Sequence, residues 1–308
     1  MSSPSSPPAA RDSIRRHSRS FSLASRLLPA DKRADVERLY SWCRWCDDGV
    51  DNAESAEEAA EFVELATADL RLIVNGEVPH TTESLWFGSV VRRHHLSVAA
   101  AEALLIGMKS DLTPAENLSV DDLMRYGFRV AGAVGVLMCP ILGLRDRRFL
   151  PHATALGIGM QLTNIARDVA EDWGRYRCYL PIEWTGGLRP GPARPDSEPV
   201  RRGVQKLLDV ADGFYCAGES GVSALDRDSR FAVHAAARIY HAIGAKIRRR
   251  RFDVLEGRVR VSLAEKLRLL AGLVVPGVGF RGFFDGDART EAALAVSQQL
   301  LLEHGVEL

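Results

Sequence analysis

The chain has little of several features that would indicate other classes of protein. Its 308 residues contain only five cysteines, which are too few and too scattered for a disulfide framework and favour a reducing compartment. Residues 1–8 are rich in Ser and Pro and lack the basic-then-apolar pattern of a secretory signal. The longest uncharged run, residues 130–144, has 15 residues and falls short of the roughly 20 that span a bilayer. The sequence therefore predicts a soluble, cytoplasmic protein.

An excess of charge is also missing. Lys and Arg number 40 and Asp and Glu number 40, so the formal net charge is zero. Nucleic-acid-binding chains normally carry a basic excess, and we therefore predict no nucleic-acid partner. A glycine-rich nucleotide loop is absent as well, because Gly157-x-Gly159 lacks a third glycine and a preceding strand. Cys43-x-x-Cys46 has no second such pair and no nearby His, which disfavours a zinc or redox site.

Helical periodicity dominates what is present. Runs of alternating β-branched residues are scarce, whereas apolar residues recur at three- and four-residue spacing in segments such as 35–45, 204–215 and 230–249. Residues 119–122 (SVDD) have the hydroxyl and early acids of a helix start. The pattern predicts an all-α protein: a disordered Ser/Pro-rich tail over 1–12 and one helical domain over 13–308.

One segment departs from the helical pattern. Residues 184–200 contain three glycines and four prolines, which predicts a flexible loop. A loop of this length in a compact domain is either a surface connector or a flap beside a site, and the sequence leaves both alternatives open.

Two helical stripes carry acidic groups. Asp47 and Asp51 stand one turn apart, about 6 Å along a helix axis, and Asn164, Asp168 and Asp172 form a second stripe at spacings of four. Each stripe alone is compatible with a solvated helix face. Both, however, lie in strongly apolar sequence. Like charges one turn apart destabilise an isolated helix, so a compensating group is expected.

The oxygen atoms of these stripes suggest what the compensating group is. Carboxylates and an amide oxygen form a hard ligand set that suits Mg²⁺, which keeps several waters and shares its coordination with substrate phosphates. Arg44 and Arg167 stand beside the acids and add positive charge. The sequence thus predicts a polyphosphate ligand that is held to the protein through metal ions.

The motifs resemble those of the squalene/phytoene synthase family, whose members join two prenyl chains head to head. The resemblance spans residues 17–273. The matching motifs are HSRSF at 17–21, LYSWCRWCDDGVD at 39–51, GMKSDL at 107–112, Tyr126, VAG at 130–132, VG at 134–135, QLTNIARDV at 161–169 followed by Glu171 and Asp172, and RCYLP at 177–181. The details are most similar to bacterial phytoene synthases. Tyr176 departs from the pattern, because the family usually has Gly before this Arg.

The resemblance implies a helical isoprenoid-synthase fold with a central cavity, and it implies roles for residues. Residues expected to hold Mg²⁺, with Mn²⁺ as an alternative, are Asp47, Asp51, Asn164, Asp168 and Asp172. Residues expected to be catalytic are Asp47, Asp51, Asp168, Asp172, Tyr40 and Arg44. Residues expected to bind substrate are His17, Arg19, Ser20, Phe21, Tyr126, Gln161, Arg167, Arg177, Tyr179 and Arg258. The cavity wall is expected to include Leu162, Ala131, Gly132 and Gly135. For the three small residues, close helix–helix packing is the alternative interpretation.

The implied reaction condenses two geranylgeranyl diphosphates, through a cyclopropylcarbinyl diphosphate, to phytoene. No NADPH is expected for it. The alternative is a synthase that makes squalene or dehydrosqualene from two farnesyl diphosphates, and a catalytically silent helical subunit is a third reading. The partners expected are the prenyl diphosphates. Peripheral contact with the inner face of the membrane is compatible with release of so apolar a product, and the sequence does not determine the oligomeric state.

Overall fold

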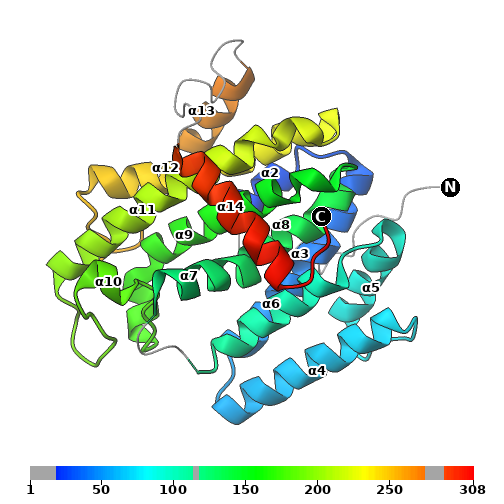
Figure 1. Cartoon of the computed structure of the whole chain (residues 1–308), viewed down its shortest axis with the longest axis horizontal. Helices are drawn as coiled ribbons and strands as arrows, with labels where there is room; N and C mark the ends of the chain where they lie inside the picture. The colour runs from blue at the N-terminus through cyan, green and yellow to red at the C-terminus, as the bar shows by residue number, and fades with distance from the viewer. Residues whose placement is uncertain (1–18, 114–117, 275–287) are drawn as a thin grey trace.

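The computed structural model describes residues 19–113, 118–274 and 288–308, and these residues form helices and connecting segments with no strand (Figure 1). The all-α prediction is confirmed. The α-helices are α2 (Arg19–Ser25), α3 (Ala30–Asp51), α4 (Ala56–Val74), α5 (Thr82–His94), α6 (Val98–Ser110), α7 (Val120–Gly127), α8 (Ala133–Ile141), α9 (Leu150–Gly174), α10 (Ile182–Thr185), α11 (Ser197–Ser220), α12 (Arg227–Arg249), α13 (Leu263–Val274) and α14 (Ala288–Glu303). A π-helical turn, η1 (Phe128–Gly132), joins α7 to α8, and short 3-10 turns are η2 (Arg147–Phe149) and η3 (Val222–Ala224).

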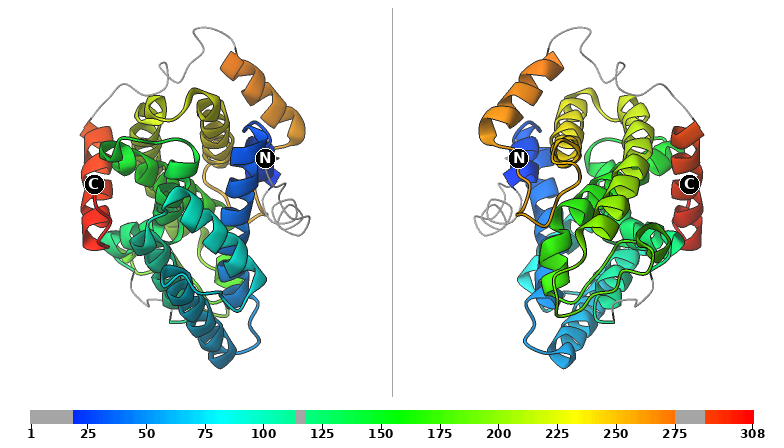
Figure 2. Two further views of the ribbon diagram at one scale, coloured as in Figure 1. Left: turned by 90° about the vertical axis from the view of Figure 1, so that its right-hand side faces the viewer. Right: turned by 90° about the vertical axis from the view of Figure 1, so that its left-hand side faces the viewer.

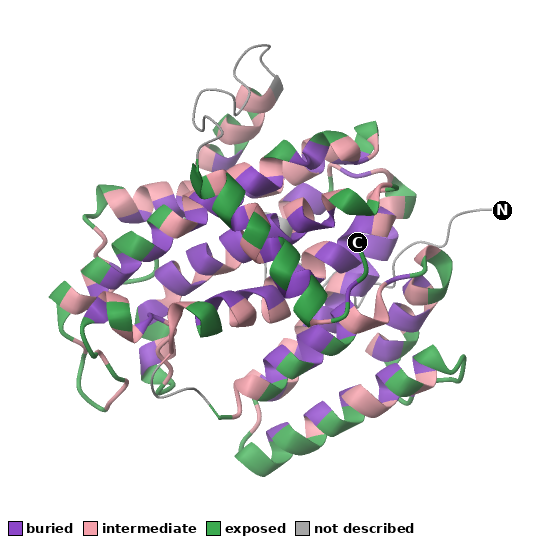
Figure 3. Cartoon of the chain, viewed as in Figure 1, coloured by how far each residue is buried: buried purple, intermediate pink, exposed green. Residues whose placement is uncertain are grey.

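Helix α9 is the central element. It packs against α7, η1, α8, α11, α12 and α14, and α14 crosses it on one side (Figures 1 and 2). Its inward residues, among them Ile158, Leu162 and Ile165, are buried in one apolar core (Figure 3). Helix α4 lies at the periphery, and α13 stands off the body beside α12. The long acidic-stripe helix predicted from the sequence is therefore the helix around which the others assemble.

Small residues let the neighbours of α9 approach closely. A Cβ atom on Gly157 would lie 2.4 Å from the Ala131 carbonyl oxygen, and one on Gly135 would lie 2.5 Å from the Ala153 carbonyl oxygen. These clashes are with backbone, which cannot move aside cheaply. Gly135 therefore packs closely against α9, and it does so in addition to lining the cavity described below.

Serine side chains start several helices. Ser55 accepts a hydrogen bond from the Glu58 N–H at the start of α4, and Ser97 accepts one from the Ala100 N–H at the start of α6. At α7, Ser119 and Asp122 form the reciprocal capping box, which confirms the helix start predicted there.

The segment expected to be irregular over 184–200 is shorter than predicted. Residues 184–185 end α10, and α11 already begins at Ser197, so only 186–196 lack helical structure. Asp196 caps α11 by accepting from the Glu198 N–H. Pro199 is tolerated because it lies in the first helical turn, where its missing N–H has no helical partner. The tail predicted over 1–12 lies outside the described residues.

No helix among the described residues is both long and apolar enough to cross a bilayer. This agrees with the hydropathy of the sequence.

We predict that Gly157→Ala destabilises the protein by about 2 kcal/mol, because the added methyl group meets the backbone of η1. The expected measurement is a melting temperature several degrees lower than that of the unmodified protein. Gly272→Ala in α13 is the matched control, since nothing lies within 4 Å of its Cβ position. Alanine there raises helix propensity and stabilises by about 0.5–1 kcal/mol. Equal effects of the two substitutions would contradict the packing argument.

Candidate active site

A cavity of about 350 Å³ lies between α3, η1, α8, α9 and α12, within the size range of small-molecule sites. Its walls are mainly apolar, with residues such as Leu104, Val134 and Met138. The polar lining residues from the predicted site gather at one end, which we call the acidic end. They are Tyr40, Arg44, Asp47, Tyr126, Gln161 and Asn164.

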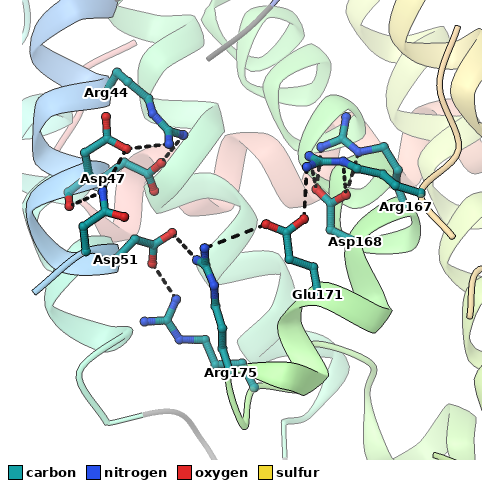
Figure 4. A network of polar contacts seen from close by, with 11 residues as sticks. Arg44, Asp47, Asp51, Arg167, Asp168, Glu171 and Arg175 are labelled. Atoms are coloured by element: carbon teal, nitrogen blue, oxygen red, sulfur yellow. Dashed lines mark hydrogen bonds and ion pairs between the residues drawn. The ribbon is translucent and has the colours of Figure 1, made fainter. Parts of the chain in front are cut away.

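On α3, one arginine neutralises two acids. Arg44 donates to Asp47 at 2.6 Å and to Asp48 at 2.5 Å, one turn further along the helix (Figure 4). The pKa of Asp47 is raised to about 6, mainly by burial; Arg44 acts to lower it and the nearby Asp51 to raise it. The Asp47 carboxylate is therefore only partly compensated.

On α9, two arginines hold one carboxylate. Arg167 donates from Nε to Asp168 at 2.7 Å, and Arg258, which follows α12 in the chain, donates to the same carboxylate at 3.1 Å. Arg258 also donates to Glu171 at 3.0 Å. The fold thus places Arg258 beside Asp168, 90 residues away in the sequence.

Two further arginines connect the acidic helices. Asp51 at the end of α3 accepts from Arg175 and from Arg177, each at 2.7 Å, and both arginines follow α9. Arg175 also lies 3.8 Å from Glu171, so it stands between the two stripes (Figure 4). Between these arginines, Tyr176 has a φ of 57° and is mostly exposed. This left-handed conformation favours glycine, which accounts for the glycine that the motif usually has at this position; Tyr176 adopts it at a cost in backbone strain.

Asp111, just after α6, forms the base of a small polar cluster. Tyr179 donates to it at 2.8 Å and Tyr126 at 3.3 Å, and the two tyrosine rings stack with centroids 4.7 Å apart. Burial raises the pKa of Asp111 to about 6, while Tyr179 and Arg177 act in the opposite direction. The tyrosines are thus fixed at the acidic end of the cavity.

Two groups on α9 remain poorly compensated. The pKa of Asp172 is raised to about 7, mainly by burial and in addition by the charges of Asp168 and Glu171. The Oδ1 atom of Asn164 is buried and has no hydrogen-bond partner, although its Nδ2 donates to Gln161 at 3.3 Å. An unpartnered oxygen beside crowded carboxylates is what a hard cation would satisfy, so the donor set fits Mg²⁺.

The carboxylates are not gathered into a ready-made cage. Among the residues that the structure describes, no three His, Cys, Asp or Glu side chains are close enough together to hold a metal ion. Arginines are paired with Asp47, Asp51 and Asp168 here. The metal-ligand assignment therefore stays a prediction.

Most predicted site residues come together at this end of the fold, but two do not. Leu162 is fully buried in the core on the other side of α9. Gly132 packs against Phe128 and Thr154. Neither is among the residues that line the cavity, so their assignment to its wall was wrong. His17 lies outside the described residues, and the side chains of Arg19, Ser20 and Phe21 are not described.

Sequence reasoning missed Asp111 and Arg175. Asp111 gave a weak signal, a single acid after the apolar helix α6, within a motif that had no assigned role. Arg175 gave none, because its contact with Asp51 joins positions 124 residues apart. Ala131 and Gly135 line the cavity as predicted.

The chain is similar to a family model, to several proteins of known activity and to solved structures. A family model described as squalene/phytoene synthase matches residues 14–265. A 15-cis-phytoene synthase of Paracoccus sp. (strain N81106 / MBIC 01143) is 34% identical, covering 84% of this chain and 88% of that protein. A phytoene synthase of Cereibacter sphaeroides is 37% identical, and the match covers 92% of this chain and 83% of that protein. The crystal structure of a dehydrosqualene synthase in complex with ligand superposes with a TM-score of 0.76 at 26% identity, covering 85% of this chain and 93% of that one.

The raised pKa values predict how the stability of the metal-free protein depends on pH. Protonated Asp172 is favoured in the folded state, since its pKa is about 7 there against 3.8 ordinarily. Its contribution to stability is present below pH 4 and is lost as the pH rises toward 7. Asp47 and Asp111 act in the same direction up to about pH 6. We expect a lower melting temperature at pH 8 than at pH 5 in a chelator-treated sample.

Asp172→Asn should reduce the difference in melting temperature between pH 5 and pH 8 by a few degrees, because an amide does not ionise as the pH rises. The control is Asp146→Asn, since Arg148 lowers the pKa of this exposed carboxyl and keeps it ionised throughout the window. A pH dependence unchanged in the Asp172 variant would contradict the assignment.

Proposed function

Because the chain belongs to the squalene/phytoene synthase family, we propose that it joins two geranylgeranyl diphosphate molecules head to head to form 15-cis-phytoene, with release of both diphosphates. The enzyme is a prenyltransferase. The observation that carries the proposal is that one member of each stripe, Asp47 and Asn164, lines the same end of an otherwise apolar cavity. A diphosphate and a long hydrocarbon chain are the two parts of a prenyl diphosphate, and the two parts of the site complement them.

The arginines at the acidic end supply the charge that diphosphate recognition needs. Arg44, Arg167 and Arg177 present guanidinium groups beside the carboxylates, and guanidinium–phosphate hydrogen bonds are among the stronger polar contacts in proteins. Arg258 and Arg175 add two further cations at the same place. As negative charge develops on a departing diphosphate, these fixed charges stabilise it.

Mg²⁺ is the proposed cofactor. Its ligands would be Asp47 and Asp51 on α3 and Asn164, Asp168 and Asp172 on α9. The bound ion would supply Lewis-acid neutralisation of the diphosphate oxygens. The unpartnered Asn164 Oδ1 and the raised pKa of Asp172 support this set.

The apolar part of the cavity protects the carbocations of the reaction. Loss of the first diphosphate gives an allylic cation, and the double bond of the second molecule captures it to form the cyclopropylcarbinyl diphosphate. A second ionisation, rearrangement and loss of a proton then give the hydrocarbon. Leu104, Val134 and Met138 exclude water from this space. Because the final step is loss of a proton, no NADPH is required.

Tyr126 and Tyr179 are proposed to orient the diphosphate-bearing end of the substrate. Their hydroxyls are held by Asp111, and burial raises the pKa of both phenols well above the ordinary value. They therefore remain neutral hydrogen-bonding groups at physiological pH and offer no base of their own.

Purified protein with Mg²⁺ and geranylgeranyl diphosphate is expected to yield a C40 hydrocarbon without NADPH, identified by mass spectrometry. A C30 product formed only from farnesyl diphosphate would instead establish the dehydrosqualene alternative, and NADPH-dependent squalene would establish the squalene one. Absence of any turnover would favour a silent subunit.

Asp47→Asn and Asp168→Asn test the metal set within the same assay. Each is expected to lower turnover by at least 100-fold while the circular dichroism spectrum stays helical, because each removes a charged ligand without changing size. The control is Asp228→Asn, an exposed acid paired with Lys32 far from the cavity's acidic end. Near-normal turnover in both site variants would refute the metal assignment.

The product has to leave for a lipid phase, and we propose that α13 gives the enzyme peripheral contact with a membrane. Leu263 and Leu267 on this helix are 65% and 53% exposed, and Arg260 and Arg268 beside them are exposed too. Apolar and basic groups together suit an anionic lipid surface.

Cosedimentation with anionic vesicles tests this contact. Leu263→Ser combined with Leu267→Ser should reduce the bound fraction several-fold, whereas Leu65→Ser combined with Leu85→Ser, two exposed leucines on α4 and α5, should leave it unchanged. Equal binding of both double variants would refute the role of α13.

A further inference from the structure

The cavity is elongated, and the order of its lining residues along α9, α3, α12 and the α7–α8 segment shows which end is which. On α9 the lining residues run from His152 to Asn164, and on α3 from Val36 to Asp47. On α12 they run from Ala232 to Tyr240. Along the α7–α8 segment, Tyr126 touches Asp111 at the acidic end and Leu144 lies at the opposite extreme. The end far from the carboxylates is therefore formed by the first turn of α9 and the segments beside it.

A histidine lies at this far end. His152 lines the cavity, and its Nδ1 lies 2.8 Å from the Ala217 carbonyl oxygen and 3.0 Å from the Ser220 hydroxyl. A carbonyl only accepts, so Nδ1 carries the proton and donates. Ala217 belongs to the last turn of α11, whose carbonyl groups have no partner within the helix. The hydrogen bond thus holds the imidazole ring in one orientation.

The surrounding backbone also fixes the ring. A Cβ atom on Gly221, just after α11, would lie 2.3 Å from the His152 Cβ, so only glycine leaves room for the histidine here. Phe149 packs against the ring with centroids 5.3 Å apart. The His152 side chain is therefore held in place by backbone on one side and by an aromatic ring on another.

The distance between the two ends corresponds to a particular chain length. From Asn164 to His152 the wall of α9 extends 12 residues, or about 18 Å at 1.5 Å per residue. The 16-carbon main chain of an extended geranylgeranyl group is about 19 Å long and the 12-carbon main chain of a farnesyl group about 14 Å, because a C–C bond near 1.5 Å advances about 1.27 Å along the axis of a zigzag chain. A C20 chain reaches His152, whereas a C15 chain ends about one helical turn short of it.

We propose that the ring of His152, seated against Gly221 and the end of α11, is the floor that selects the C20 prenyl chain. This inference rests on the proposed function and deepens it by naming the residue that determines substrate length. His152 acts by its size and fixed position, and it takes no part in the proton transfers of the reaction.

Ala153→Phe tests the floor by raising it. Ala153 lines the cavity next to His152, and a phenyl ring there fills the space that the last isoprene unit needs. The ratio of C20 to C15 turnover is expected to fall at least tenfold. The matched control is Ala236→Phe on α12, which lies one turn from Tyr240 at the acidic end and should obstruct both chain lengths alike. The ratio of the affinities for unreactive C20 and C15 thiolodiphosphates, measured by calorimetry, should change in each variant in the same direction as the turnover ratio.

His152→Ala tests the floor by lowering it. The variant is expected to bind a C25 thiolodiphosphate at least tenfold more tightly than the unmodified protein does. His152→Leu keeps a side chain of similar length without the hydrogen bond, and it should retain the C20 preference. Melting temperatures establish that each variant is folded.

The outcomes separate this inference from the proposed function. If the unmodified protein makes no C40 product, the proposed function fails before the variants are compared. If it makes the C40 product and the length preferences of Ala153→Phe and His152→Ala stay within twofold of its own, the floor assignment is overturned. A shift caused equally by Ala236→Phe would also overturn it.

Discussion

Repulsion between carboxylates at one end of an apolar cavity is the constraint on which the site depends. Asp47, Asp51 and Asp168 lie on α3 and α9, two helices that both line the cavity, and low-dielectric surroundings make uncompensated charge costly. Each of the three is paired with at least one arginine. Asp172 has less compensation and its pKa is raised to about 7. The zero net charge of the chain thus conceals a local excess of acid that cations must balance.

Close packing around α9 builds the other half of the site. The glycines that allow η1 and α8 to touch α9 also leave space on the cavity side, because a residue without a side chain serves both surfaces. In the first turn of α9, His152 fits against the chain after α11 because the residue there, Gly221, has no side chain. One helix therefore carries the stripe proposed to bind Mg²⁺ toward one end and the proposed floor of the cavity toward the other.

The parts of the site that could be predicted are those encoded by spacing along one helix. The stripes at Asp47 and Asn164 follow from a repeat of four residues, and Arg44 and Arg167 lie next to them in sequence. Asp111 and Arg175 could not be predicted, since their roles depend on contacts with Tyr179 and Asp51 in other segments. Leu162 was misplaced because helical periodicity defines faces without saying which face meets the cavity.

The sequence by itself determined the helical class, the acidic stripes and membership of a family, because periodicity and ordered motifs are local properties of a chain. Only the tertiary structure decided which arginine pairs with which acid, and which residues lie at the far end of the cavity. His152 and Gly221 are 69 positions apart, and nothing in either neighbourhood indicates that they meet. Contacts of this kind are selected by how helices pack, and packing depends on the whole core at once.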